Sequence, residues 1–401
     1  MRSFSAGALA LACMSGCSLG VGRKSVQEFR FAQEIPEGDT GFANALYQSV
    51  DASMTKGNEL TVVDNGEIFA AALAAISKAR HSVNIVTFIW SDGRISDRFV
   101  EALADRVRNG IQCRVLVDAV GSPSFDRVGR ALDLAGCEWH KFRPIPGQDD
   151  RARNHRKMVI VDGRTGFTGG FGIDDRWDGE GASDDPPQWR DSNVRARGPV
   201  VLAMQQAYAE NWLEATGTLL PAADFPEPEL AGHSSAGFVS STEHRVTTRN
   251  DRLIQLLIST ARKRIWIANA YFVPSTPIAE LLARKASAGL DVRILAPGDK
   301  SDAKPYLPSQ RARMDNLARF GVRAYEYQPA MMHGKTMIVD DRFVLVGSCN
   351  LDALSLNMMD EGGLVVDDPA LAAEEARRFE RDLQVSIERD ASRQLRKTAA
   401  R

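Results

Sequence analysis

The sequence predicts an α/β fold with two pseudo-symmetric halves, each a mixed, largely parallel β-sheet flanked by helices. Two observations predict it. The chain passes twice through the same strand–helix–strand–helix–strand order, which is the pattern of βαβ units. A polar motif then follows each pass at the same internal spacing. Paired motifs in a duplicated fold are expected to face one another, so we expect an active site at the interface of the halves.

The matching elements occur in the same order in both halves. Each half starts with a helix end, a basic turn and an apolar strand, and an amphipathic helix, a glycine stop and a second strand follow. A third helix end and strand complete the pattern. Two shorter apolar runs joined by a turn then predict a hairpin. The paired segments are 75–90 with 257–272, 99–118 with 278–297, 132–144 with 317–329, and 157–170 with 335–348.

Five segments make up the predicted domain organisation. Residues 219–245 are rich in Pro, Ala and Gly, which is typical of a connector. The second half is expected to end in a C-terminal helix. The predicted boundaries are 1–17 for a signal peptide, 18–55 for an N-terminal extension, 56–218 for the first half, 219–245 for the connector and 246–401 for the second half.

The N-terminus has the pattern of an exported protein. Arg2 precedes an apolar run at 6–14 and small residues that end at Cys17, and the run is too short to span a bilayer. Met-Ser-Gly-Cys resembles the lipobox of bacterial lipoproteins. Lipid attachment at Cys17 would tether the protein to a membrane surface, on the periplasmic side of a bacterial cell envelope. An exported soluble protein with a plain signal peptide and a cytosolic protein are the alternatives.

The composition is that of an ordinary globular protein, with 44% hydrophobic and 25% charged residues. A formal net charge of −2 lacks the basic footprint of a nucleic-acid-binding protein, although a local basic pocket is compatible with it. We therefore expect no nucleic-acid partner. We also expect a monomer.

Three of the five cysteines lie outside the leader: Cys113, Cys137 and Cys349. Cys113 and Cys137 open two consecutive predicted strands, so they could pair in an exported protein. Ordinary buried thiols are the favoured interpretation. The cysteine spacing matches no metal site.

The polar motif lies in residues 154–172 and again in residues 331–350. Each copy has a histidine, a lysine two positions later, an aspartate five positions after the lysine, and a pair of small residues further on. One copy alone would be weak evidence of function, but two copies in register within matching repeats are poorly explained by chance. The catalytic candidates are His155, Lys157 and Asp162 in the first copy and His333, Lys335 and Asp340 in the second.

These residue types suit phosphate chemistry. Residues i and i+2 of a strand point to the same side, so each histidine shares a face with its lysine. The lysine disfavours a divalent metal and favours the neutral, nucleophilic imidazole, so we expect neither metal nor cofactor. Small residues would let a phosphate approach the backbone closely, and an asparagine adds an amide donor. The substrate-binding candidates on these grounds are Gly170, Ser348 and Asn350.

The duplicated pattern resembles HxK(x)4D(x)6G(G/S)xN of the phospholipase D superfamily, over almost all of the chain after residue 55. The resemblance implies a covalent phosphohistidine intermediate, formed without metal where two halves meet. It implies His155 as the nucleophile and His333 as the acid and then the base. Asp162 and Asp340 belong to the motif, but their offset from the histidines puts them at the hairpin turns, so we expect them to act structurally.

In this superfamily a carboxylate further along the chain orients each histidine. Glu361, 28 residues after His333, fits that place in the second half. Asp191 is the candidate in the first half. A turn, or an ion pair with Arg190 or Arg195, is an open alternative for Asp191.

Four positions depart from the superfamily pattern. Gly172 stands where the first copy should have its asparagine, so that amide donor is lost on one side. Leu354, Leu356 and Met359 stand where relatives usually have an arginine, a phenylalanine and an asparagine. Both histidines and both lysines are present, so we expect activity.

Several segments look most like bacterial cardiolipin synthase-type proteins: GGFGIDDRW, WRDSNVRARGPVV, AYAENWLEATG and NAYFVPS. That resemblance implies transfer of a phosphatidyl group from phosphatidylglycerol to a second phosphatidylglycerol, at a membrane surface. Hydrolysis of phospholipids to phosphatidic acid is the alternative within the same chemistry. A nuclease and a non-catalytic lipid-binding protein are the alternatives from other classes.

Overall fold

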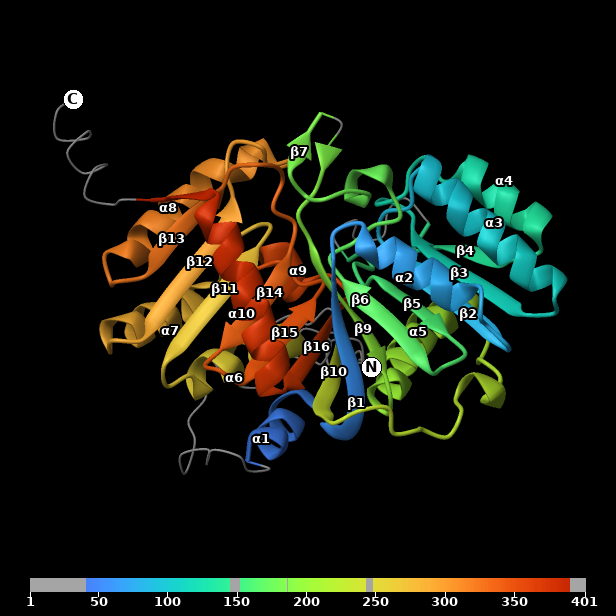
Figure 1. Ribbon diagram of the computed structural model, residues 1–401, viewed down its shortest axis with the longest axis horizontal. Coiled ribbons are helices and arrows are strands. Elements are labelled where there is room, and N and C mark those ends of the chain that lie inside the picture. The colour runs from blue at the N-terminus through green and yellow to red at the C-terminus, as the bar shows by residue number, and fades with distance from the viewer. Residues whose placement is uncertain (1–40, 145–151, 186, 243–247, 390–401) are drawn as a thin grey trace, which may run out of the picture.

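The computed structural model describes residues 41–144, 152–185, 187–242 and 248–389 (Figure 1). Their strands form one 15-stranded sheet and a small two-stranded one. The strands before the connector are β1 (Thr55–Asp64), β2 (Ser82–Thr87), β3 (Gln112–Asp118), β4 (Glu138–Phe142), β5 (Met158–Val161), β6 (Thr165–Gly169), β7 (Ser183–Asp184), β8 (Pro187–Gln188) and β9 (Ser192–Arg197). The later strands are β10 (Ser234–Ser241), β11 (Arg264–Asn269), β12 (Asp291–Pro297), β13 (Arg323–Tyr327), β14 (Lys335–Val339), β15 (Phe343–Gly347), β16 (Glu361–Asp367) and β17 (Ser386–Glu388).

Helices pack against both faces of this sheet. The α-helices are α1 (Gly41–Val50), α2 (Glu67–Ile76), α3 (Arg94–Arg108), α4 (Asp126–Ala135), α5 (Val200–Thr216), α6 (Arg249–Thr260), α7 (Thr276–Ser287), α8 (Leu307–Ala318), α9 (Ala353–Asn357) and α10 (Pro369–Gln384). Short 3₁₀ helices are η1 (Asp175–Trp177), η2 (Ala222–Asp224) and η3 (Lys304–Tyr306).

The large sheet has a pseudo-two-fold between β1 and β10. On one side of this seam the strand order is β1-β9-β6-β5-β2-β3-β4, and on the other it is β10-β16-β15-β14-β11-β12-β13, with β17 added at the edge. The two orders are equivalent element by element. The predicted α/β fold with two pseudo-symmetric halves is therefore confirmed.

Parallel and antiparallel pairing occupy different parts of the sheet. The ladders β2–β3–β4 and β11–β12–β13 are parallel. The ladders nearer the seam, including β1–β10 itself, are antiparallel. The sheet is thus mixed, and its parallel strands are the outer ones, each connected to the next by a helix.

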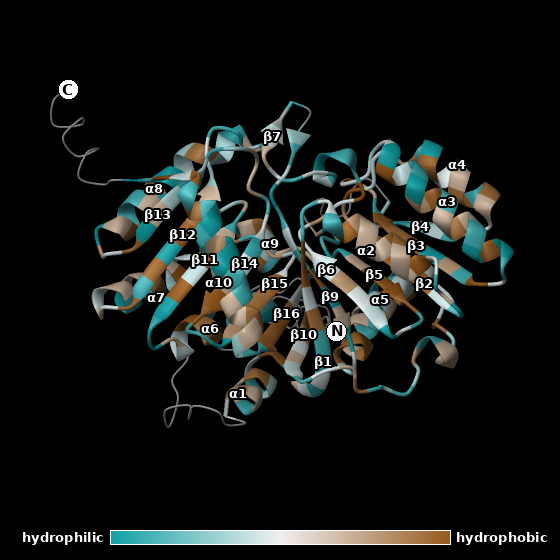
Figure 2. Cartoon of the chain, viewed as in Figure 1, coloured by the Kyte–Doolittle hydropathy of each residue, from teal (hydrophilic) through white to brown (hydrophobic). Residues whose placement is uncertain are grey.

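Alternate residues of the strands supply separate cores on the two faces. In β2, Val83 and Ile85 pack under α2, α3 and α4, whereas Val86 belongs to the core under α5. In β11, Ile265 and Ile267 pack under α6, α7 and α8, and Trp266 packs toward α10. Figure 2 shows hydrophobic stretches along the central strands and mixed hydropathy along the outer helices.

Two segments take part in the fold more closely than the sequence predicts. Within the predicted extension, α1 places Phe42 against Phe343 of β15, with ring centroids 4.2 Å apart. Within the predicted connector, 219–245, residues Ser234–Ser241 form the seam strand β10. Most residues of this strand are Ser, Ala or Gly and lack the β-branched pattern that predicts a strand. Their burial between neighbouring strands favours the extended conformation.

Cys113 and Cys137 form a disulfide. The favoured expectation of two buried thiols is therefore wrong. The two residues begin neighbouring parallel strands, one in β3 and one just before β4, so their Cα atoms lie only 4.8 Å apart. Cys349 is a free cysteine.

None of the helices in the described part of the chain is long and apolar enough to cross a membrane. The predicted signal peptide and Cys17 lie outside the described residues.

Removing the disulfide should lower the free energy of unfolding. The bond joins residues 24 apart, and closing a loop of that order restricts the unfolded chain by about 3 kcal/mol. Urea unfolding followed by circular dichroism, with and without reductant, measures the effect. The Cys113→Ala/Cys137→Ala double variant should match the reduced protein and lose its response to reductant. Equal unfolding midpoints for the oxidised and reduced protein would contradict the prediction.

Candidate functional site

The two motif copies meet at one pocket between the halves. His155 and Lys157 lie just before β5, and His333 and Lys335 lie at the start of β14; all four side chains are buried. A pocket of about 710 Å³ opens there, and His155, Lys157 and His333 line it. Asn350 lines it as well. The duplicated motif therefore forms one composite site, as the sequence predicts.

Each histidine is held by backbone contacts from the opposite half. The amide of His155 donates to the carbonyl of Asp360 at 2.8 Å, and the amide of His333 donates to the carbonyl of Arg190 at 2.6 Å. Isolated parallel bridges, Asn154 to Asp360 and Arg190 to Met332, accompany these contacts. Both histidines thus sit where the halves exchange backbone hydrogen bonds.

The side-chain partners are exchanged in the same way. Nδ1 of His155 lies 2.9 Å from Oε1 of Glu361, and Nδ1 of His333 lies 2.9 Å from Oδ2 of Asp191. The structure therefore brings together the predicted histidines and carboxylates, but each carboxylate serves the histidine of the other half. A hydrogen bond from Nδ1–H to a carboxylate leaves Nε2 as the free, nucleophilic nitrogen.

Asp191 itself has no ion pair with its neighbour Arg190. The Arg190 guanidinium instead bonds Asp382 of α10 at 3.0 Å and lies 3.3 Å from Asp64 of β1. Arg195 pairs with Glu59. The alternative of a local ion pair for Asp191 does not describe this structure.

Further hydrogen bonds hold the two carboxylates. Oε2 of Glu361 accepts the hydroxyl of Ser348. Oδ2 of Asp191 accepts the indole N–H of Trp177 at 2.8 Å, and Oδ1 accepts the amide of Ser192 at 2.9 Å. Ser348 therefore contacts the carboxylate and not the pocket, although we expected it to bind substrate.

Gly170 also serves a carboxylate. A Cβ at this position would lie 2.5 and 2.6 Å from the two carboxylate oxygens of Asp191, closer than real Cβ atoms come. Gly170 thus makes room for Asp191, and Ser348, at the equivalent position of the second half, donates a hydrogen bond to Glu361. The close approach of a phosphate to this glycine stays a prediction.

The two lysines lie close to the histidine backbones. Nζ of Lys157 donates to the carbonyl of His155 at 2.7 Å, and Nζ of Lys335 donates to that of His333 at 2.5 Å and lies 2.9 Å from its Nε2. Burial lowers the pKa of Lys157 to about 7 and that of Lys335 to about 8. An anion entering the pocket would favour both ammonium forms.

Burial also decides the charge of the histidines. It lowers the pKa of His155 to about 4 and places that of His333 well below its usual value, with Lys335 adding to the effect. Burial raises the pKa of Asp191 to about 6. Glu361 is equally buried, but His155 and Lys157 hold its pKa below the usual value. The free site thus presents two neutral imidazoles.

Asp162 and Asp340 lie at the other end of their strands, after β5 and β14. The Asp162 carboxylate accepts the backbone N–H groups of residues 80–82, and the Asp340 carboxylate accepts those of residues 262–264. Both aspartates have a positive φ, 56° and 54°. The geometry agrees with a structural role in the turn.

Other pocket walls come from residues that the sequence analysis did not single out. Phe88 and Ile89 follow β2, Tyr271 follows β11, and Asp302 lies before η3. Tyr271 belongs to the segment NAYFVPS, which resembles relatives, but the sequence does not indicate that this tyrosine lines the pocket. The remaining lining residues include Trp189, Tyr306, Asp352, Leu354, Ser355 and Met359.

The two halves differ at the asparagine position. The side chain of Asn350 faces the pocket, whereas a Cβ at Gly172 would meet Trp177 at 3.0 Å and Ile89 at 3.1 Å. The space of the missing asparagine is therefore filled by hydrophobic side chains. Met359 and Leu354, two further departures from the superfamily pattern, also line the pocket.

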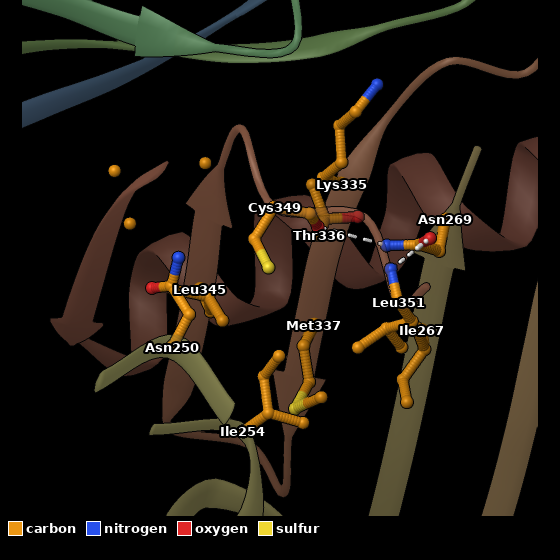
Figure 3. Close-up of a pocket in the computed structure, with 13 residues that line it drawn as sticks. Asn250, Ile254, Ile267, Asn269, Lys335, Thr336, Met337, Leu345, Cys349 and Leu351 are labelled. Carbon is orange, nitrogen blue, oxygen red and sulfur yellow. Dashed lines mark hydrogen bonds between the residues drawn. The ribbon is translucent and has the colours of Figure 1, made fainter. Parts of the chain in front are cut away.

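A smaller, mostly apolar cavity of about 20 Å³ lies beneath the second motif (Figure 3). Figure 3 shows the Lys335 side chain pointing away from the cavity, while Met337, Ile254 and Ile267 line it. At its rim, Asn269 donates to the carbonyl of Cys349 at 3.3 Å and accepts the amide of Leu351 at 2.9 Å. Asn269 thereby holds the turn that carries Asn350.

Among the described residues, no group of three or more His, Cys, Asp or Glu side chains is arranged to hold a metal ion. The buried ammonium beside each imidazole disfavours a cation at the motif.

A family model described as "Cardiolipin synthase, PLD-like domain" matches residues 72–177 and 253–383, more than half of the chain. The chain belongs to this family. The predicted resemblance to the phospholipase D superfamily is confirmed. The two matched segments fall one in each half and contain one motif histidine each.

Named relatives agree with this assignment. Cardiolipin synthase A of Pseudomonas aeruginosa is 32% identical over 352 residues, which cover 86% of this chain and 71% of the relative. Cardiolipin synthase of Halalkalibacterium halodurans is 31% identical over 311 residues, covering 75% of this chain and 61% of the relative.

Two solved structures share the fold. The phosphatidylserine synthase of Haemophilus influenzae superposes with a TM-score of 0.65 at 14% identity, covering 86% of this chain and 92% of that one. A polyphosphate kinase of Porphyromonas gingivalis gives a TM-score of 0.55 at 13% identity, covering 84% and 49%. At these identities the likeness concerns the fold alone.

Replacing Asp340 with alanine should reduce stability more than catalysis. It removes a carboxylate that accepts three backbone N–H groups, and leaving such donors unpaired costs about 2–3 kcal/mol. Urea unfolding measures the loss. Asp341→Ala is the matched control, because Asp341 makes only exposed ion pairs and should change stability by less than about 1 kcal/mol. A stable Asp340→Ala protein without activity would instead support a catalytic aspartate.

Proposed function

We propose that the protein is a metal-independent phosphatidyltransferase that forms cardiolipin from two molecules of phosphatidylglycerol. The observation that carries this proposal is the composite pocket. It is lined by His155, His333 and Lys157, each histidine is paired with a carboxylate of the other half, and Lys335 lies against His333. The relatives named as cardiolipin synthases support the choice of substrate.

The geometry assigns a role to each motif residue. His155, neutral and with Nδ1 on Glu361, can attack phosphorus through Nε2 and form a phosphatidyl-histidine. His333 can donate a proton to the departing glycerol oxygen, because the bound anionic phosphodiester favours its protonated form. A second phosphatidylglycerol hydroxyl then gives its proton to His333 and attacks phosphorus, releasing His155.

The remaining polar groups can stabilise the transition state. Lys157 and Lys335 bring positive charge next to the phosphoryl oxygens that the two histidines would address. Asn350 adds an amide on the second-half side. Its Oδ1 has no hydrogen-bond partner among the described residues, so the side chain is free to reorient toward a ligand.

We also propose that the mature protein is a lipoprotein tethered at Cys17 to a membrane surface on the periplasmic side. The lipobox-like sequence supports this placement. The Cys113–Cys137 disulfide supports an oxidising compartment, where such bonds persist. A tether would raise the local concentration of a lipid substrate.

The central experiment supplies purified full-length protein with phosphatidylglycerol vesicles in EDTA and resolves the lipid products. Cardiolipin and glycerol should appear together. Phosphatidic acid as the main product would replace transfer with hydrolysis, and cleavage of added DNA with unchanged lipid would overturn the lipid assignment. His155→Ala and His333→Ala should each lower turnover by at least about three orders of magnitude.

The order of the histidines can be tested with a donor whose leaving group is p-nitrophenol, which needs no proton to depart. His333→Ala should then still become labelled from a ³²P-donor through an acid-labile phosphohistidine, because its nucleophile is intact. His155→Ala should remain unlabelled. The reverse pattern would exchange the two roles.

The rate should fall at alkaline pH. Burial lowers the pKa of Lys157 to about 7 and that of Lys335 to about 8, so kcat/KM of the free enzyme should decline as pH rises through 7–8. Lys157→Arg should move this decline up by about one pH unit, to the value of Lys335, because a guanidinium keeps its charge. A wild-type profile that stays flat to pH 10 would contradict lysine control.

A further inference from the structure

The composite pocket has one apolar wall and one polar wall. The internal repeat pairs residues 75–90 with 257–272, so Ile89 and Tyr271 are equivalent positions. Both line the pocket. One half therefore presents a hydrocarbon side chain where the other presents a phenol.

Tyr271 does not act alone. Its hydroxyl lies 2.8 and 2.9 Å from the two carboxylate oxygens of Asp302, which also lines the pocket. Burial and the Asp302 carboxylate raise the pKa of Tyr271 well above its usual value, so the hydroxyl keeps its proton. One phenolic proton occupies one of about four acceptor sites on a carboxylate, so Asp302 can accept further donors.

The two walls lie beside different histidines. The Phe88 ring packs edge-on to His155 at 4.9 Å between centroids, next to Ile89. The Tyr271 ring lies edge-on to the His333 ring, with 6.4 Å between their centroids. The centroid of the Tyr306 ring lies 6.0 Å from that of Tyr271. The polar wall is thus next to the histidine that handles the alcohol proton, and the apolar wall is next to the nucleophile.

We propose that Tyr271 and Asp302 form the subsite for the headgroup alcohol, and that they select a polyol such as glycerol. This inference rests on the proposed transfer reaction. The Asp302 carboxylate accepts hydrogen bonds from the hydroxyls that do not react, while the Tyr271 oxygen accepts one more. The reacting hydroxyl is thereby placed beside His333.

The step that uses the subsite is balanced. The alcohol oxygen attacks phosphorus of the phosphatidyl-histidine, the P–O bond forms as the P–Nε2 bond of His155 breaks, and the hydroxyl proton passes to His333. The products are a new phosphodiester and free, neutral His155. Water bound in place of the alcohol would give phosphatidic acid by the same route, so the subsite sets the ratio of transfer to hydrolysis.

The chemistry of the wall favours hydroxyls that can donate. Asp302 and Asp352 both line the pocket, so this wall offers carboxylate acceptors to hydroxyl donors. Leu354 and Met359 add no positive charge to the lining. Glycerol offers two hydroxyls beyond the one that reacts, and both can donate to Asp302.

The test uses phosphatidyl-p-nitrophenol as the donor, with increasing glycerol. Nitrophenol release measures formation of the phosphatidyl-histidine, and the ratio of phosphatidylglycerol to phosphatidic acid measures use of the alcohol subsite. Tyr271→Ile, which copies the other half, and Asp302→Asn should lower this ratio about tenfold, which is a larger effect than on nitrophenol release. Tyr271→Phe, which keeps the ring, should lower it in the same direction.

The matched control is Tyr208→Phe, which loses a buried hydroxyl in α5, away from the pocket, and should keep the wild-type ratio. Unchanged ratios in both Tyr271 and Asp302 variants, with normal nitrophenol release, would overturn the subsite alone. A proportional loss of release and transfer would show that the pair is only structural. Absence of release from the wild-type protein would overturn the proposed function and this subsite with it.

Discussion

The site depends on one constraint, the exchange of carboxylates between the halves. Glu361 orients His155 and Asp191 orients His333, each at 2.9 Å, so neither half contains a complete histidine pair by itself. The antiparallel seam between β1 and β10 sets the distance over which this exchange occurs. Because each acid begins or directly precedes a strand, β16 or β9, its position follows from sheet register rather than from a mobile loop. Register is strongly specified where both faces are buried, and that makes the geometry reproducible.

Two buried arginines hold the exchanged segments in place. Arg156, next to His155, donates to the carbonyl of Glu361 at 3.2 Å and to that of Ala207 in α5 at 2.7 Å. Arg190, next to Asp191, joins β1 to α10 through Asp64 and Asp382. The acids are therefore fixed from behind by charge-assisted hydrogen bonds, while their oxygens face the imidazoles. Removing a partner of a buried guanidinium costs folding free energy. The same arginine contacts therefore stabilise the seam and hold the carboxylates of the site in position.

The sequence was sufficient for the fold class and for the motif histidines and lysines that meet between the halves, because spacing repeated in two halves reports both. It could not show which carboxylate serves which histidine, since His155 and Glu361 are 206 positions apart and either pairing satisfies the pattern. The contact of Gly170 with Asp191 could not be predicted, because a small residue beside a phosphate site and one beside a carboxylate look the same in sequence. Strand β10 was missed because its small residues gain strand character only from their neighbours in the sheet. The disulfide depended on which strands are adjacent, which composition does not encode.

Duplication made two similar half-sites, and the differences between them favour one assignment of roles. His155 and Lys157 hold the pKa of Glu361 below its usual value, whereas burial raises the pKa of Asp191 to about 6. When two similar acids have different pKa values, they are suited to different roles. One can orient a nucleophile, and the other can share a proton with a general acid. A firmly ionised Glu361 keeps Nδ1 of His155 protonated and Nε2 free to attack. An acid that titrates nearer neutrality suits His333, which must take up and return a proton in each cycle. These electrostatics support the proposed assignment of His155 as the nucleophile.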